Sequence, residues 1–410
     1  MHRSYQQTQD LQTEIARPAL RERLLSALLS RLESGVLTVQ FPSGNRRSFV
    51  GSRPAGRPLL PAELNIYNWA GLSQALRRGA TGLAEAYMEG HWSTPDLTRL
   101  LLLLEHNMQA LGRGLPKTKL FRLNDRWGHR RNRNSRKGSR RNISFHYDLG
   151  NDFYELWLDP SMTYSSALFE HAGQDLEAAQ EAKYRRLAQD VGIQPGDHVL
   201  EIGCGWGGFA EFAVREYGCK VTGLTLSREQ LAFAQDRLEK AGLADKAEFL
   251  LCDYRDVEGR FDHIVSIEML EAVGEEYWPT YFERLEALLK PGGKAGVQVI
   301  TIEDHRFETY RRGADFIQKY IFPGGMLPCD RVMKEQIDRA GLKLNCQLDF
   351  GQSYADTLAV WHHDFLMRRR EVREIGFDGR FERLWRFYLS YCEAGFRLGN
   401  INVSHYVMCK

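Results

Sequence analysis

The sequence has few cysteines and no long apolar run. The first shortage argues against a protein built on disulfides or zinc, and the second argues against a membrane-spanning protein. The seven cysteines are an odd number without a Cys-x-x-Cys pair, which argues against a disulfide framework or a zinc site and favours a reducing cytoplasm. The polar start, residues 1–14, lacks the apolar core of a signal peptide. The most apolar run, residues 100–104, is too short to span a bilayer. We therefore expect no metal site, a cytoplasmic protein, and membrane contact that is only peripheral, at the inner face of the cell membrane.

Charge is nearly balanced overall, at +2 over 410 residues, but it is unevenly placed. Residues 113–141 contain twelve Lys or Arg and the single acid Asp125. A polybasic segment of this kind binds phosphate on an anionic membrane or on nucleic acid, or serves as a solvated linker. Nucleic acid is not expected, because only Phe121 and Trp127 could stack on bases. We interpret the segment as a linker that contacts an anionic membrane surface.

The linker divides the chain into two parts with different patterns. Residues 1–112 show helical spacing at 18–33, 68–78, 82–88 and 97–108, with a hairpin expected at 36–41 and 47–50. This part is predicted to be a smaller, mostly helical accessory domain that interacts with lipid. In residues 142–410, strands alternate with helices, which predicts an α/β fold with a doubly wound, mainly parallel sheet. Ligands on such sheets bind at the carboxyl ends of the strands.

A glycine-rich turn follows the first strand of this second part. Gly203, Gly205 and Gly207 come after an apolar strand that contains Glu201, and glycines let a ligand approach the backbone closely. A dinucleotide site would place an acid at the end of the next strand, but residues 220–226 end without one. The position of Glu201 inside the first strand resembles the first motif of S-adenosylmethionine (SAM)-dependent methyltransferases.

Eight segments of the second part carry motifs of one family. They are His146-Tyr-Asp-Leu-Gly-Asn-Asp-Phe-Tyr154, Asp159-Pro-x-x-Thr-Tyr-Ser165, Glu201-Ile-Gly-Cys-Gly-Trp-Gly-Gly208, Gly223-Leu-Thr-Leu-Ser227, Asp253-Tyr-Arg-Asp256, Ile321-Phe-Pro-Gly-Gly-x-Leu-Pro328, Phe350-Gly-x-x-Tyr-x-x-Thr-Leu358 and Tyr388-x-x-x-Cys-x-x-x-Phe396. Over residues 140–410 the chain resembles the cyclopropane-fatty-acyl-phospholipid synthases, and residues 80–92 resemble their accessory domain more loosely. The resemblance implies a class I SAM-dependent methyltransferase that acts on unsaturated acyl chains of phospholipids, with a homodimer as one oligomeric state.

The resemblance also implies which residues bind SAM. Tyr164 and Ser165 would face the methionine end, Gly203 and Gly205 would pass beneath it next to Glu201, Thr225 and Gln230 would lie near the ribose, and Asp253 and Tyr254 would flank the adenine. Two of these residues have a second interpretation. Gln230 is also the last residue of a Ser227-x-x-Gln230 capping box, and Tyr254 could be a packing aromatic. His146, Tyr147 and Asp148 could serve the reacting centre or only structural hydrogen bonds.

The reaction of this family needs a base after the methyl group reaches the double bond. A carbocation forms, and aromatic faces stabilise it without trapping it. The family is understood to use bicarbonate held by cysteine, glutamate, histidine and tyrosine. Here Glu271 and Tyr354 keep two of these positions, whereas Ser166 and Gln298 replace the cysteine and the histidine. Ser166 and Gln298 can still donate hydrogen bonds to an anion, so a bicarbonate site and Glu271 as the base itself both stay open.

The two replacements leave more than one product and function open. Loss of a proton from the transferred methyl group closes a cyclopropane ring, whereas loss of a neighbouring proton gives a methyl- or methylene-branched chain. Cys392, near the end of the chain, could be catalytic or a packed helix cysteine. The alternatives to a lipid C-methyltransferase are a small-molecule N-methyltransferase of the same fold and a lipid-binding homologue without activity.

Overall fold

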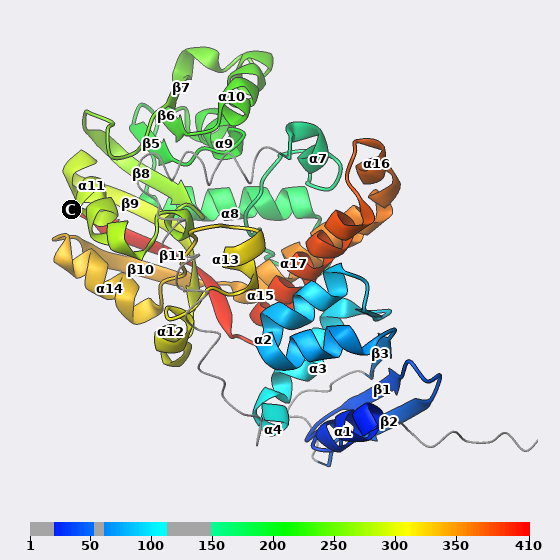
Figure 1. Ribbon diagram of the computed structural model, residues 1–410. Helices are drawn as coiled ribbons and strands as arrows, with labels where there is room; N and C mark the ends of the chain where they lie inside the picture. The colour runs from blue at the N-terminus through cyan, green and yellow to red at the C-terminus, as the bar shows by residue number, and fades with distance from the viewer. Residues whose placement is uncertain (1–19, 53–60, 113–148) are drawn as a thin grey trace, which may run out of the picture.

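The structure, a computed structural model, describes residues 20–52, 61–112 and 149–410 (Figure 1). The predicted linker at 113–141 and the motif residues 146–148 lie outside the described residues. Among the described residues, no helix is both long and apolar enough to cross a membrane.

A seven-stranded sheet forms the centre of the second part, in the order β10-β11-β9-β8-β5-β6-β7. The strands from β9 to β7 in this order are parallel, and β11 is antiparallel to both of its neighbours. The predicted α/β class is therefore confirmed. The strands are β5 (His198–Ile202), β6 (Lys220–Thr225), β7 (Ala247–Leu251), β8 (Phe261–Ile267), β9 (Leu289–Ile302), β10 (Lys343–Asp349) and β11 (Ile401–Cys409).

Helices cover both faces of this sheet, because alternate residues of its strands are apolar on opposite sides. Val199 of β5 packs in a cluster with helices α8, α9 and α10. Its neighbour Leu200 packs in another cluster with α11 and α14. These helices are α8 (Leu176–Val191), α9 (Gly208–Tyr217), α10 (Arg228–Lys240), α11 (Trp278–Leu288) and α14 (Asp330–Arg339).

The amino-terminal part contains more strand than the sequence analysis predicted. The expected hairpin is present, but a four-stranded sheet in the order β2-β1-β3-β4 extends it. Only the two ends of β3, Ala62 and Ile66, are buried, so its apolar alternation is too weak to indicate a strand. Helices still account for most of the described residues of this part, as predicted, and the four-stranded sheet is an addition that the sequence pattern did not indicate. The elements are α1 (Leu20–Leu29), β1 (Val36–Gln40), β2 (Arg46–Val50), β3 (Ala62–Ile66), α2 (Trp69–Met88), β4 (Trp92–Ser93), α3 (Leu97–His106) and α4 (Met108–Gly112).

The amino-terminal part shares a hydrophobic core with the end of the chain. Helix α17 (Gly379–Arg397) packs against α2 and α3 (Figure 1), and the rings of Tyr87 and Phe387 lie 5.9 Å apart. Buried Glu85 of α2 accepts hydrogen bonds of 2.7 Å from Lys319 Nζ and Tyr320 Oη. The other helices named below are α12 (Asp304–Tyr310), α13 (Phe316–Tyr320), α15 (Gly351–Met367) and α16 (Arg369–Glu374).

Candidate functional site

A single cavity of about 1030 Å³ extends from the carboxyl ends of the central strands into the amino-terminal part. At one end it is lined by the glycine turn and its neighbours. At the other end it is lined by leucines of α1, β3, α2, α3 and α4: Leu25, Leu28, Leu29, Leu64, Leu83, Leu101, Leu104 and Leu111. The cavity therefore joins a polar end, where the motif residues lie, to an apolar end.

All nine residues predicted to bind SAM line the polar end. The turn between β5 and α9 keeps Gly203 and Gly205 at φ values of +85° and +51°, which side chains rarely adopt. A Cβ at Gly203 would lie 3.0 Å from Met269 Cγ, whereas a Cβ at Gly205 would meet no protein atom within 4 Å. The backbone of Gly205 is thus open to a ligand. The nine residues are Tyr164, Ser165, Glu201, Gly203, Gly205, Thr225, Gln230, Asp253 and Tyr254.

Several buried polar atoms at this end have no hydrogen-bond partner within the described residues. Thr225 Oγ1 donates to Gln230 Oε1 over 2.9 Å, so the Gln230 side chain does not cap α10 as its spacing predicted. Gln230 Nε2, Glu201 Oε2 and Tyr254 Oη are all buried without a partner. Buried polar groups are almost always satisfied, so these atoms fit a ligand with polar groups of its own, as an adenosine or a methionine has.

Two charged side chains, Asp253 and Lys183, lie at or beside the polar end of the cavity. Asp253 accepts hydrogen bonds from Nε and Nη2 of Arg255 over 2.8 and 2.6 Å, and this pairing orients its carboxylate. Lys183 of α8 is fully buried, and its Nζ donates to Ser165 Oγ over 2.7 Å. Burial lowers the pKa of Lys183 to about 7, opposed by Glu268, Asp159 and Glu201. A lysine on a helix usually indicates a solvated face, so the sequence pattern does not predict this contact.

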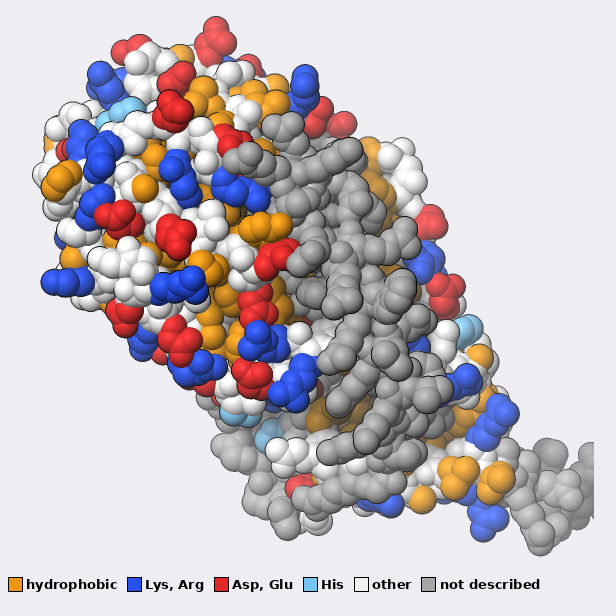
Figure 2. All heavy atoms as spheres, turned by 60° about the vertical axis from the view of Figure 1, so that its left-hand side comes forward, with side chains coloured by type: hydrophobic (Ala, Val, Ile, Leu, Met, Phe, Trp, Pro, Cys, Tyr) orange, Lys and Arg blue, Asp and Glu red, His pale blue; other side chains and the backbone are white. Residues whose placement is uncertain are grey.

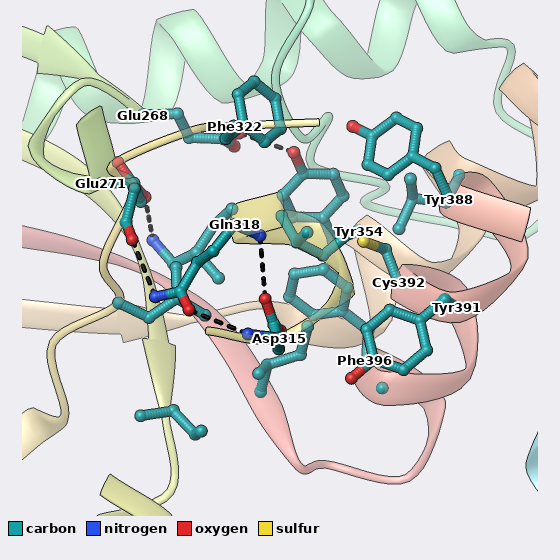
Figure 3. Close-up of a pocket in the computed structure, with 18 of the residues that line it drawn as sticks. Glu268, Glu271, Asp315, Gln318, Phe322, Tyr354, Tyr388, Tyr391, Cys392 and Phe396 are labelled. Carbon is teal, nitrogen blue, oxygen red and sulfur yellow. Dashed lines mark hydrogen bonds between the residues drawn. The ribbon is translucent and has the colours of Figure 1, made fainter. Parts of the chain in front are cut away.

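Beyond the turn, the carboxylate of Glu268 stands at the carboxyl end of β8. It accepts a hydrogen bond from Tyr354 Oη over 2.6 Å (Figure 3). It also accepts hydrogen bonds from Ser166 N–H and Gln298 Nε2 over 2.8 Å each. Glu268 was not among the predicted site residues. Its backbone has a φ of +50°, an uncommon and strained conformation for a residue with a side chain.

Glu271 lies one short helical turn further along the chain and also lines the cavity. Its Oε1 accepts a hydrogen bond from Ile300 N–H over 2.5 Å, and its Oε2 has no partner within the described residues. Burial, together with the charge of Glu268, raises the pKa of Glu271 to about 8. Glu271 therefore carries a proton at neutral pH.

The remaining predicted residues lie around Glu268, but not all of them reach the cavity. Ser166 and Gln298 do not line it: the Ser166 hydroxyl donates to Ala167 O over 2.9 Å, and Gln298 Oε1 pairs with His405 Nε2 over 2.9 Å. Tyr354 and Cys392 do line it. Burial raises the pKa of the Cys392 thiol, so this cysteine stays protonated and is a poor nucleophile.

Aromatic rings surround the space next to these carboxylates. Tyr354 stacks on Phe396 with ring centroids 4.4 Å apart, and Tyr164 Oη lies 2.9 Å from Tyr388 Oη. Figure 3 shows Tyr354 directed toward Glu268, with Tyr388, Tyr391, Cys392 and Phe396 presented by α17. The ring of Phe322 lies 6.2 Å from that of Tyr388. Ring faces attract cations, so this end of the cavity suits a reaction with positive charge. No group of three or more metal-ligating side chains occurs in residues 20–52, 61–112 and 149–410.

The fold and the site define a class I SAM-dependent methyltransferase. The crystal structure of the mycolic acid cyclopropane synthase CmaA1, complexed with SAH and CTAB, superposes with a TM-score of 0.63 at 31% identity, covering 66% of this chain and 98% of that one. The chain belongs to the mycolic acid cyclopropane synthetase family, whose model matches residues 134–406.

Two curated relatives match over most of the chain. The tuberculostearic acid methyltransferase UfaA1 of Mycobacterium tuberculosis is 42% identical over 82% of this chain and 80% of its own length. The cyclopropane-fatty-acyl-phospholipid synthase of Escherichia coli is 35% identical over 84% of this chain and 86% of its own length. The family resemblance drawn from the sequence is therefore confirmed.

Proposed function

We propose that the enzyme transfers the methyl group of SAM to the double bond of an unsaturated acyl chain of a membrane phospholipid, giving a cyclopropane or a methyl- or methylene-branched chain. The cavity carries this proposal, because it joins the SAM-binding motifs to a leucine-lined end in a single space. An acyl chain fills an apolar cavity without any polar group that must lose its hydration. A small soluble amine, the substrate of an N-methyltransferase, would not need the leucines.

The names of the relatives support both product classes. One relative is named for tuberculostearic acid and another for cyclopropane fatty acyl phospholipids. SAM supplies an electrophilic methyl group on a sulfonium when it is bound. The residues of this chain would align the double bond with that methyl group, shield the cationic carbon with rings such as Tyr354 and Phe396, and accept a proton at a carboxylate.

Incubation of the purified protein with labelled SAM and defined unsaturated phospholipids, followed by mass spectrometry of the released acyl chains, tests the proposal. We expect each modified chain to gain one carbon from SAM, and the fragment pattern distinguishes a ring from a branch. Label transferred only to an added soluble amine would support the alternative N-methyltransferase. SAM binding by calorimetry distinguishes an enzyme from a homologue that only binds lipid.

The apolar end of the cavity can be tested with one pair of variants on α3. Leu104 lines the cavity and Leu102 does not, although both are half-buried in the same core cluster. We expect Leu104→Asp to lower methyl transfer to acyl chains by about tenfold or more, because an ionised carboxylate opposes apolar contact. SAM affinity should stay unchanged. Leu102→Asp is the matched control, and equal losses of turnover in both variants would contradict the assignment.

Exposed leucines suggest how the apolar end meets a membrane. Leu20 and Leu24 of α1 are 71% and 62% exposed, whereas the opposite face of the same helix lines the cavity. Hydrophobic side chains reach the surface in this amino-terminal region (Figure 2). The proposed partner is an anionic membrane, with the predicted basic segment at 113–141 adding an attraction that salt weakens.

Sedimentation with anionic vesicles tests this contact. We expect the double variant Leu20→Ser/Leu24→Ser to bind about 100-fold more weakly, because each buried leucine contributes roughly 1.5 kcal/mol. The matched control is Met367→Ser/Ile375→Ser, which removes exposed apolar side chains next to α16. Binding that is equally strong to neutral vesicles and insensitive to salt would contradict the role of the basic segment.

A further inference from the structure

Three separate segments converge on the carboxylate of Glu268. The Tyr354 hydroxyl comes from α15, the Gln298 amide from β9, and the Ser166 N–H from the loop before α8. Oε1 accepts two of these hydrogen bonds and Oε2 accepts one. A carboxylate oxygen has two lone pairs, so Oε2 keeps one that is free to take a proton.

The orientation of the Gln298 amide is fixed by a buried histidine. His405 lies opposite Gln298 in the β9–β11 pairing, and the two side chains form a hydrogen bond of 2.9 Å. Burial lowers the pKa of His405 to about 3, so its ring is neutral and Nε2 carries the hydrogen that it donates to Gln298 Oε1. The Gln298 nitrogen consequently faces Glu268.

These donors occupy the positions that the family resemblance assigns to bicarbonate binding. They do not fit an added bicarbonate here, because Tyr354, Gln298 and the Ser166 N–H all donate to Glu268 already. A second anion would also lie beside the buried carboxylate of Glu268, and like charges in a buried site repel strongly.

We infer that the Glu268 carboxylate is the base of this enzyme, a fixed part of the chain standing where the family uses bicarbonate. This inference rests on the proposed function. The π electrons of the double bond form the new bond to the methyl carbon, and the electrons of the broken S–CH3 bond stay on sulfur. A C–H bond then breaks, either on the transferred methyl group or on a carbon next to the cationic carbon. Its proton moves to Glu268 Oε2, and its electron pair closes the ring or forms a new double bond.

The backbone of Glu268 supports a functional rather than a structural role. Its φ of +50° is a conformation that glycine adopts without strain. A glutamate is held there although it strains the backbone and buries a charge, and such strain is concentrated at functional sites. Glycine at this position would relieve the strain, so the variant Glu268→Gly is expected to fold with a Tm at least equal to that of the wild type.

The test measures kcat for methyl transfer to unsaturated phospholipid with and without bicarbonate. We expect the wild type to be equally active in both buffers. Glu268→Gln should lower kcat by about 100-fold or more, the usual contribution of a general base, with SAM affinity unchanged. Glu268→Gly should lose similar activity but regain about tenfold when bicarbonate or formate is added, because either anion can enter the space that the side chain leaves.

A control variant and two contrary outcomes complete the design. Glu22 is a fully buried glutamate outside the cavity that accepts hydrogen bonds from Ser43 and Asn45, and Glu22→Gln should keep its activity. If the kcat of the wild type falls when bicarbonate is removed, the inference about Glu268 is wrong, and the proposed function still stands. The same holds if the kcat of Glu268→Gln stays within about threefold of the wild-type value. A wild type that methylates no acyl chain in either buffer would overturn the proposed function first.

Discussion

Replacement of Gly205 by valine is expected to raise the Kd for SAM by about 100-fold or more, equivalent to roughly 2.7 kcal/mol. Gly205 lines the polar end of the cavity, and a Cβ there meets no protein atom within 4 Å. A branched side chain would therefore stand in the space through which the ligand approaches the backbone. Isothermal titration calorimetry with SAM measures the effect directly.

Valine at position 205 has two effects, because it strains a backbone with positive φ and also fills the space next to the backbone. A control variant must show the first effect without the second. Gly242, in the turn after α10, has a φ of +70°, meets nothing within 4 Å of its added Cβ, and lies outside the cavity. Gly242→Val thus costs the same roughly 1–2 kcal/mol of backbone strain without entering the site. We expect both variants to lose similar Tm and only Gly205→Val to lose SAM affinity. Similar SAM affinity in the two variants would show that the turn does not contact the ligand.

Glu271→Gln is expected to change the pH dependence of stability. The folded-state pKa of Glu271 is about 8, raised from 4.5 chiefly by burial. A raised carboxyl pKa contributes stability that is complete below the unfolded-state pKa and is lost as pH rises toward the folded-state pKa. Between pH 5.5 and pH 8.5 the free energy of unfolding of the wild type should therefore fall by about 3 kcal/mol, at 1.36 kcal/mol per pKa unit. The variant has no carboxyl group at this position and should not show this fall.

Urea unfolding of both proteins at these two pH values measures the difference, since the other titrating groups cancel in the comparison. Glutamine resembles the protonated glutamic acid in shape, so the two proteins should differ less at pH 5.5. A free-energy gap that stays constant across the pH range would mean that Glu271 is ionised in the folded protein at neutral pH.

Local patterns in the sequence predicted the central sheet and the SAM end of the cavity well. Strands β5, β6 and β8 have strong apolar runs, and Gly203, Gly205 and Asp253 follow strands of the parallel part. The edge strand β10 has no such run, with no buried residue in Lys343–Asp349. The amino-terminal sheet was harder to predict, because β3 buries only its two ends and β4 has only two residues.

The hydrogen-bond partners of the site residues could not be predicted from the sequence, because most of them come from segments that are distant along the chain. The spacing of Ser227 and Gln230 predicted a capping box, and the Ser227 side chain does cap α10 by accepting from the Gln230 N–H. The Gln230 side chain accepts from Thr225 instead of completing the box. Glu268 directly follows β8, and nothing in its sequence neighbours shows that Tyr354, 86 positions later, donates to it. Long-range pairs such as Gln298 with His405 have no signal in a single sequence.

Helix α17 forms one wall of the cavity. One side of it presents Tyr388, Cys392 and Phe396 to the cavity, and it also packs against α15 and against α2 and α3 of the amino-terminal part. A truncation that removed the first 112 residues would strip one side of this wall and expose apolar surface next to the reacting carboxylates. The amino-terminal part is consequently not an accessory that can be exchanged between enzymes, because the shape of the active site depends on it.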